Sequence, residues 1–171
     1  MVAPYAPVTT EEKILTNLSV IMLASVTGLK ASYARAPFSL PDSSLPANIN
    51  IFGPLDEVIN QGPGIDLVTR TLFVRIYCAH AEQGLSGDAE SAVIPFLSSV
   101  PSVLRGRPSL NTGLFGSSVP YLLDASYQGI KDGGISILPS YSGDQYIGAE
   151  FRLRVITTSI CGFGRVIVSK F

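Results

Sequence analysis

The stretch VTRTLFVRIYC, residues 68–78, decides how this chain folds, because its side chains alternate in type. Successive side chains of a β-strand point to opposite faces of a sheet, so this segment has one apolar and one mixed face. Only Arg70 interrupts the apolar face. The segment therefore predicts a central strand packed against a core. The apolar face comprises Val68, Leu72, Val74, Ile76 and Cys78, and the mixed face comprises Thr69, Thr71, Phe73, Arg75 and Tyr77.

A first helix is expected before this strand. Thr9 and Glu12 have the spacing of a capping box, in which each side chain bonds the backbone N–H of the other. Apolar residues then recur every three or four positions, which predicts a helix from about Glu11 to Val26. These apolar positions are Ile14, Leu18, Ile21, Met22 and Val26.

A second helix is expected after the strand, over about residues 89–104. The apolar positions again have helical spacing, and the basic residue, glycine and proline that follow are typical helix-ending signals. Pro95 and Pro101 should kink or divide this helix, because proline lacks the backbone N–H and collides with the preceding turn. The stop signals are Arg105, Gly106 and Pro108.

The segment between the first helix and the strand has little regular pattern. Alternation over Ala31–Arg35 predicts a short strand, and residues 36–64 form a long proline-rich connection in which Asn48–Phe52 is a candidate strand. Connections of this length usually have a function or become ordered by contacts elsewhere. We therefore expect this loop to be mobile in the free subunit and ordered in an assembly.

The C-terminal part has the pattern of β-structure. The residue clusters 132–134 and 142–144 predict turns that separate the strands. The strand after the second turn is the most regular, with Ile147, Ala149, Phe151, Leu153 and Val155 on one face. The expected strands are residues 119–127, 134–138, 145–160 and 166–169.

These elements predict one α+β domain spanning residues 1–171. Its sheet should be mixed or mainly antiparallel, with the two main helices packed on one face, because both helices have apolar stripes that need cover. The length of 171 residues and the 46% hydrophobic content suit a single continuous core.

Composition narrows the classes of function. Twelve Lys and Arg against thirteen Asp and Glu give a net charge of -1, so the chain lacks the basic surplus that drives binding to the phosphate backbone, and we expect no sequence-specific binding to nucleic acid. The N-terminus has no basic stretch before an apolar run, and residues 14–29 are too short to cross a bilayer, so we expect no membrane association. A mean hydropathy of +0.35 with 15% charged residues indicates a partly covered surface, and hence an oligomer.

No residue pattern of catalysis, cofactor binding or metal binding is found, and we expect no enzyme. His80 is the only histidine, and its pairing with Cys78 is a weak signal. Cys78 and Cys161 lack the spacing of a zinc site. The triplet 162–164, Gly-Phe-Gly, is not a dinucleotide fingerprint. Three dispersed carboxylates are interpreted as turn residues, namely Asp124, Asp132 and Asp144.

Glu150, Arg152 and Arg154 share the mixed face of the last regular strand. Two interpretations stay open for them: a solvated outer face, or a subunit contact. They are the candidate site residues of this chain.

The order of these elements, ending in YIGAEFRLRV at residues 146–155, resembles the tail terminator, or tail completion, proteins of long-tailed bacteriophages. The resemblance covers roughly residues 8–160 and rests on hydrophobic and glycine patterns. It implies a small α+β subunit that forms a homomeric ring, by family resemblance a hexamer, which caps the tail tube and ends its polymerisation.

The resemblance also implies partners and a location. The ring would contact the tail tube protein on one side and a head-completion or connector protein on the other, and DNA would pass through it. The protein would be made in the host cytoplasm and reside in the tail or neck of the virion. The alternatives are a head-closure or other neck connector protein, a small-ligand or peptide-binding module, and a hydrolase that uses His80.

Overall fold

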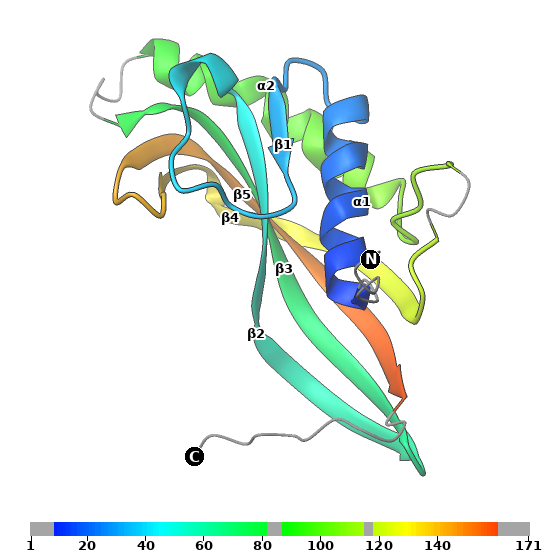
Figure 1. Ribbon diagram of the computed structural model, residues 1–171. Coiled ribbons are helices and arrows are strands. Elements are labelled where there is room, and N and C mark those ends of the chain that lie inside the picture. Colours follow the sequence, from blue (N-terminus) through cyan, green and yellow to red (C-terminus); the bar gives the residue numbers. More distant parts are fainter. Residues whose placement is uncertain (1–8, 82–86, 115–117, 161–171) are drawn as a thin grey trace, which may run out of the picture.

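The computed structural model describes residues 9–81, 87–114 and 118–160 and has an α+β fold, as predicted (Figure 1). Five strands form one mixed sheet in the order β1-β2-β3-β5-β4, in which β1 and β2 are parallel and all other neighbours are antiparallel. The elements are α1 (Thr10–Ser25), β1 (Ala31–Tyr33), a short 3-10 turn (Asp42–Ser44), β2 (Ala47–Gly62), β3 (Ile65–His80), α2 (Gly87–Arg105), β4 (Leu122–Pro139) and β5 (Gln145–Ile160).

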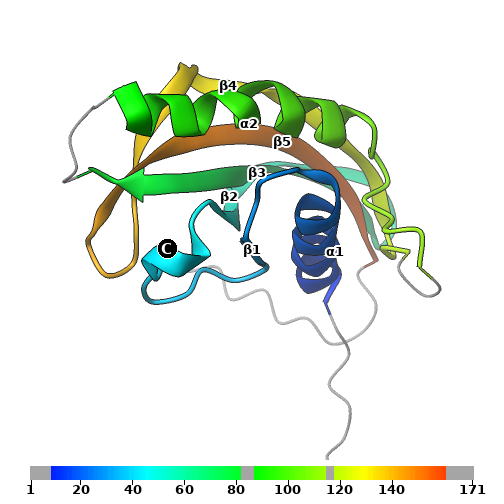
Figure 2. The same cartoon turned by 90° about the horizontal axis from the view of Figure 1, so that it is seen from above.

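The predicted central strand is confirmed as β3, which lies between β2 and β5. Its apolar face enters a core cluster with the apolar faces of β5, α1 and α2. Residues paired across neighbouring strands share a face, and the pair Val74 and Phe151 lies at the centre of this core. Both helices therefore pack into one core on this face of the sheet. Figure 2 shows how strongly the sheet is twisted, with α2 along β4 and β5 and α1 beside β1 and β2.

Helix α1 begins as the sequence predicts. The backbone N–H of Glu12 donates to Thr9 Oγ1 at 3.2 Å, and the N–H of Thr9 donates to Glu12 Oε2 at 3.3 Å. This capping box satisfies two donors that the first turn would leave free. The buried stripe consists of Ile14, Leu18, Ile21 and Met22, with Asn17 beside it.

Helix α2 is a single element, although its two prolines were expected to kink or divide it. Pro95 and Pro101 both lie inside Gly87–Arg105. Each proline removes one helical hydrogen bond. Most helical stability in proteins comes from packing of the apolar face, and here that packing outweighs the two lost bonds. The packed stripe is Ala89, Val93, Phe96, Val100 and Leu104.

The prediction of a long irregular connection over residues 36–64 is wrong for most of its length. Residues 47–62 form the 16-residue strand β2, paired with β3 almost throughout. Pro54 lies where the register shifts, between Phe52 and Leu55, which is where a strand tolerates a residue without an N–H. Only residues 34–46 remain a loop with one short turn, and they pack against the sheet.

The predicted turn at residues 132–134 is also wrong. Strand β4 is continuous, and Asp132, Gly133 and Gly134, all with positive φ, bulge out of it between the pairs Ile130–Phe151 and Ile135–Ala149. Residues that favour positive φ serve bulges as well as turns. The turn at residues 142–144 and the strand over 145–160 are confirmed. The predicted strand over 166–169 lies outside the described residues.

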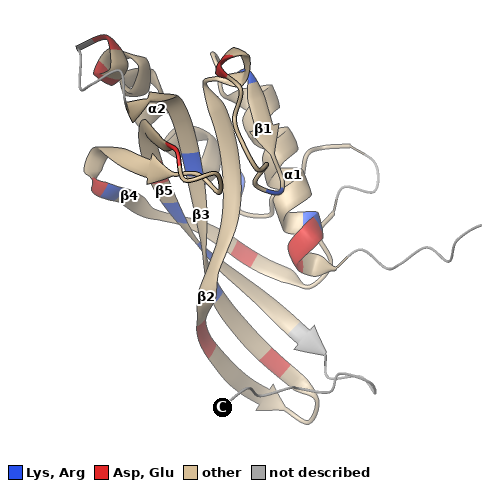
Figure 3. Ribbon diagram, turned by 60° about the vertical axis from the view of Figure 1, so that its left-hand side comes forward, with Lys and Arg blue, Asp and Glu red and all other residues tan. Residues whose placement is uncertain are grey.

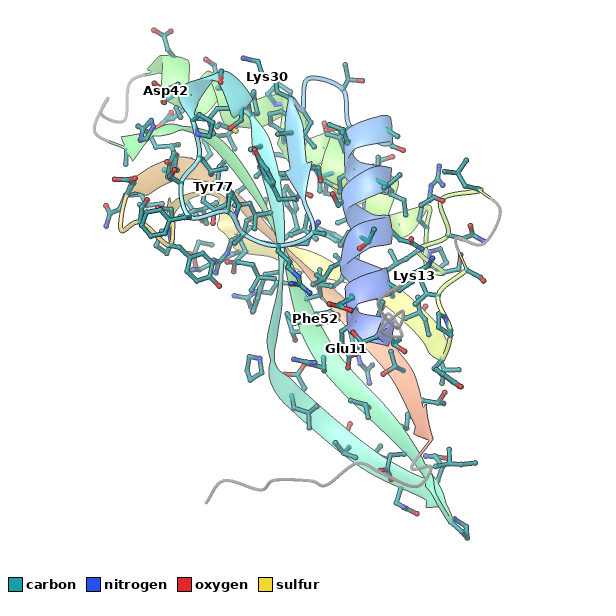
Figure 4. All side chains as sticks on the ribbon, viewed as in Figure 1. Glu11, Lys13, Lys30, Asp42, Phe52 and Tyr77 are labelled. Atoms are coloured by element: carbon teal, nitrogen blue, oxygen red, sulfur yellow. The ribbon has the colours of Figure 1, made fainter. Side chains whose placement is uncertain are left out.

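The paired ends of β2 and β3, residues 54–69 with their connecting turn, extend beyond the two helices (Figure 1). We call this segment the arm. The end of β5 pairs with β3 along it. The arm leaves the body of the subunit near the first turn of α1, where the Arg70 guanidinium lies 4.7 Å from the Phe52 ring and 3.9 Å from Glu11 (Figure 4).

In the described part of the chain, neither helix has the length and apolar character that crossing a bilayer requires.

Candidate subunit-contact surface

The outer face is the side of the sheet that faces away from α1 and α2. It is formed by the mixed face of β3 and by the three candidate residues of β5. The strand register places Arg75 opposite Glu150, Phe73 opposite Arg152, and Thr71 opposite Arg154. The sequence thus predicted the face of each candidate residue correctly, and the structure brings all three onto one row.

Glu150 differs from the two arginines because it is buried inside the single subunit. Its side chain is 3% exposed, and its Oε2 accepts a hydrogen bond from Arg75 Nε at 2.8 Å. Burial lowers the pKa of Arg75, but the hydrogen bond with Glu150 and the electrostatic effects of Tyr77 and Glu150 together outweigh it, so the Arg75 pKa lies above its ordinary value. Glu150 is therefore engaged within the subunit, whereas Arg152 and Arg154 are exposed.

Arg152 and Arg154 line a polar groove of about 510 Å³ on the outer face. The opposite wall is the root of the arm, with Asp56 and Glu57, and two threonines of β3 form the floor. Thr71 Oγ1 donates a hydrogen bond to Asp56 Oδ2 at 2.7 Å. Within the described chain, neither arginine forms an ion pair. Their guanidinium groups are therefore available to a partner.

An apolar recess of about 240 Å³ lies at the other end of the outer face, between the 34–46 loop and the β4–β5 turn. The hydroxyl of Tyr77 donates to the Pro139 carbonyl at 3.1 Å, and burial raises the Tyr77 pKa. Tyr146 donates to the Leu40 carbonyl at 3.3 Å, which ties the loop to the sheet. The recess is lined by Ala36, Pro37, Leu40, Ile49, Ile51, Arg75, Tyr77, Pro139, Ser140 and Tyr141.

His80 and Cys78 do not form a thiol–imidazole pair. Cys78 continues the apolar face of β3 into the core, whereas the register shift between Tyr77 and Ala79 turns His80 to the outer side, with its ring 4.4 Å from the Tyr146 ring. Burial raises the Cys78 pKa to about 12, so its thiol is protonated at neutral pH. His80 Nε2 lies 2.8 Å from Asp42 Oδ1, and this contact links β3 to the 34–46 loop.

The dispersed carboxylates remain dispersed. Asp132 lies in the β4 bulge, and Asp144 accepts a hydrogen bond from Ser142 Oγ at 2.6 Å in the β4–β5 turn. Asp124 belongs to β4. No cluster of three metal-ligating side chains occurs among the residues that the structure describes. Cys161 and the triplet at 162–164 lie outside those residues.

The arm is a candidate contact feature that the sequence analysis missed. Four of its apolar side chains, Leu55, Val58, Ile59 and Ile65, are 40–55% exposed. Val58 pairs with Val68 on the helix side, and Ile59 pairs with Leu67 on the outer side, so both faces of the arm are apolar. The available signal was the triplet Gly62-Pro63-Gly64 between two β-forming runs, which is typical of a hairpin.

Comparison of the chain with protein-family models and with curated proteins finds no match.

Proposed function

We propose that this protein is a structural virion protein that assembles into a closed homomeric ring, caps the tail tube of a long-tailed bacteriophage and forms part of the head–tail joint. The ring has six subunits by resemblance to tail terminators. Its partners are further copies of this chain, the tail tube protein and a head-completion or connector protein. The order of helices and strands on which the resemblance rests supports this proposal.

The observation that carries the proposal is the two-sided apolar arm. An antiparallel sheet with one solvated face normally carries polar side chains there, but the arm presents Leu, Val or Ile on both faces. Full burial of such a side chain contributes about 1.5–3 kcal/mol. Covering the exposed halves of the four arm side chains would therefore contribute on the order of 4 kcal/mol per subunit. A contact with another protein would supply the cover that these side chains lack in the single subunit.

A ring requires a head-to-tail contact, in which one surface of a subunit meets a different surface of the next and the rotation between neighbours closes the circle. The closure of the ring and its location in the virion are inferred from the resemblance to tail terminators.

The small-ligand alternative has less support. The groove of about 510 Å³ is lined by polar and charged side chains, whereas small-molecule sites are mostly apolar. The recess of about 240 Å³ lies below the roughly 300–1,000 Å³ of typical ligand sites. It fits one or two apolar side chains better than a small molecule.

Electron microscopy and light scattering of the purified protein, alone and with purified tail tubes, test the proposal. We expect rings in solution or at one end of each tube, and shorter tubes when the protein is added during tube polymerisation. A protein that stays monomeric under all these conditions contradicts ring formation. Rings that bind purified head connectors but never tail tubes would instead identify a head-closure protein.

A further inference from the structure

We propose that the arm of one subunit docks on the outer face of the next, with Asp56 and Glu57 of the arm facing Arg152 and Arg154 of the neighbour. This inference rests on the proposed ring. It adds the partner segment and the charges that set the register, and it assigns no contact role to Glu150.

The arm is acidic throughout. Residues 54–69 contain Asp56, Glu57 and Asp66 and no Lys or Arg, so the arm carries a charge of −3 at neutral pH. Asp56 and Glu57 are exposed near its root, and Figure 3 shows red but no blue segments toward the free end of the β2–β3 pair. An acidic hairpin fits a partner surface that offers cations without ion-pair partners of their own.

The outer face offers those cations. Arg152 and Arg154 project side by side from β5, since alternate residues of a strand share a face. Guanidinium groups bind carboxylates through two parallel N–H···O bonds. The subunit's own Asp56 and Glu57 line the same groove, yet neither forms an ion pair with either arginine in the described chain. The groove therefore leaves both arginines for carboxylates from outside.

Glu150 lies on the same row as the two arginines, and its charge would matter to a docking arm. A buried carboxylate beside the docking arm would repel Asp56 and Glu57 if it were unpaired. Its bond to Arg75 neutralises it inside the subunit. The charges that the row of β5 presents to a neighbour are therefore those of Arg152 and Arg154, and the neighbour's carboxylates would share these two arginines with the subunit's own Asp56 and Glu57 across the groove.

Two charge-reversal variants test the contact. One carries Asp56→Lys and Glu57→Lys, and the other carries Arg152→Glu and Arg154→Glu. In each variant alone, the arm and the neighbouring groove carry charges of the same sign at every contact. We therefore expect the protein concentration at which half of the subunits are assembled to rise roughly tenfold or more. In an equimolar mixture, basic arms meet acidic faces and acidic arms meet basic faces. Mixing should therefore restore assembly, with the two variants in equal numbers by native mass spectrometry.

Mixing also separates this contact from one within the subunit. If Asp56 and Glu57 served only their own groove, each variant would stay impaired after mixing, because the repulsion inside each subunit would remain. The variants Lys30→Glu and Glu90→Lys, exposed charges outside the arm and groove, are the matched controls and should assemble like the parent. Circular dichroism and thermal unfolding check that every variant folds.

The outcomes distinguish the two proposals. Failure of the parent protein to assemble, alone or on tail tubes, contradicts the proposed function. If the parent assembles, two results overturn the arm–groove contact and leave the ring proposal intact. In the first, the folded variants also assemble normally; in the second, they stay impaired after mixing. Variants that assemble normally but lose affinity for DNA would show that the arginines serve nucleic acid instead, which likewise overturns the contact.

Discussion

Replacing Glu150 by Gln should lower the free energy of unfolding while leaving ring contacts in place. The substitution keeps the shape of the side chain but removes the charge that holds Arg75 Nε at 2.8 Å. Breaking a fully buried ion pair costs about 3–5 kcal/mol, because the remaining charge is left uncompensated. The Arg75 side chain is 22% exposed, so water can partly solvate its guanidinium. We therefore expect a loss of about 1.5–3 kcal/mol, the range for a hydrogen bond to a charged group.

Urea denaturation at neutral pH measures this loss, and Arg152→Gln is the control. Arg152 projects from the same face of β5 but is exposed and without an ion pair among the described residues. Its substitution should change the free energy of unfolding by less than about 0.5 kcal/mol. A double-mutant cycle with Arg75→Met isolates the coupling between Arg75 and Glu150. Equal stability of the Glu150→Gln and Arg152→Gln proteins, or no coupling in the cycle, would refute the reasoning.

Three further changes probe the fold. Phe151→Ala should cost about 3–5 kcal/mol in a denaturant titration because the ring is fully buried, whereas Phe38→Ala, 78% exposed in the loop, should be near neutral; similar losses would contradict the strand register. Gly148→Ala should prevent normal pairing of β3 with β5, because its Cβ would lie 1.9 Å from the Ile76 carbonyl oxygen, while Gly106→Ala has room and should keep the parent's melting temperature. In a Cys161→Ser background, the Cys78 thiol, with a pKa of about 12, should resist a thiol reagent at pH 8 until the protein unfolds. Its raised pKa also predicts that stability falls between about pH 9 and 12, where the unfolded thiol ionises first; rapid labelling of the native protein would contradict both expectations.

Sequence reasoning succeeded where one local period dominates. The alternation of β3 and β5 and the capping box of α1 need no knowledge of the partner, so these elements, their faces and the α+β class could be predicted. Strand β2 lacks that signal. Its inner positions Asn48 and Asn50 are buried polar residues, and their hydrogen bonds, including one from Ser32, exist only in the folded sheet.

The remaining errors arose where the same residue types are compatible with two different local structures. The same Asp-Gly-Gly chemistry that favours a turn allows the bulge of β4, and prolines that weaken an isolated helix are tolerated when its stripe is packed. For the candidate site, the pattern predicted the face of Glu150, Arg152 and Arg154. It could not predict that Arg75, 75 positions away, neutralises the first of them.

The continuity of β3 and β5 has a mechanical consequence. These two strands run from the core into the arm, and their mutual pairing shifts register only between Tyr77 and Ala79, far from the arm's root. Strand β2 instead has two of its three register shifts at the root and the third near the tip. The continuous pairing of β3 with β5 should therefore hold the arm at a fixed angle to the body of the subunit, without a hinge between them. In a ring, the angle between neighbouring subunits would be set by the fixed angle of the arm, which each subunit already has before assembly. Closing the ring would then cost little conformational entropy, because the arm is already ordered in the free subunit. A force along the arm would act parallel to β3 and β5 and would strain all of their inter-strand hydrogen bonds together.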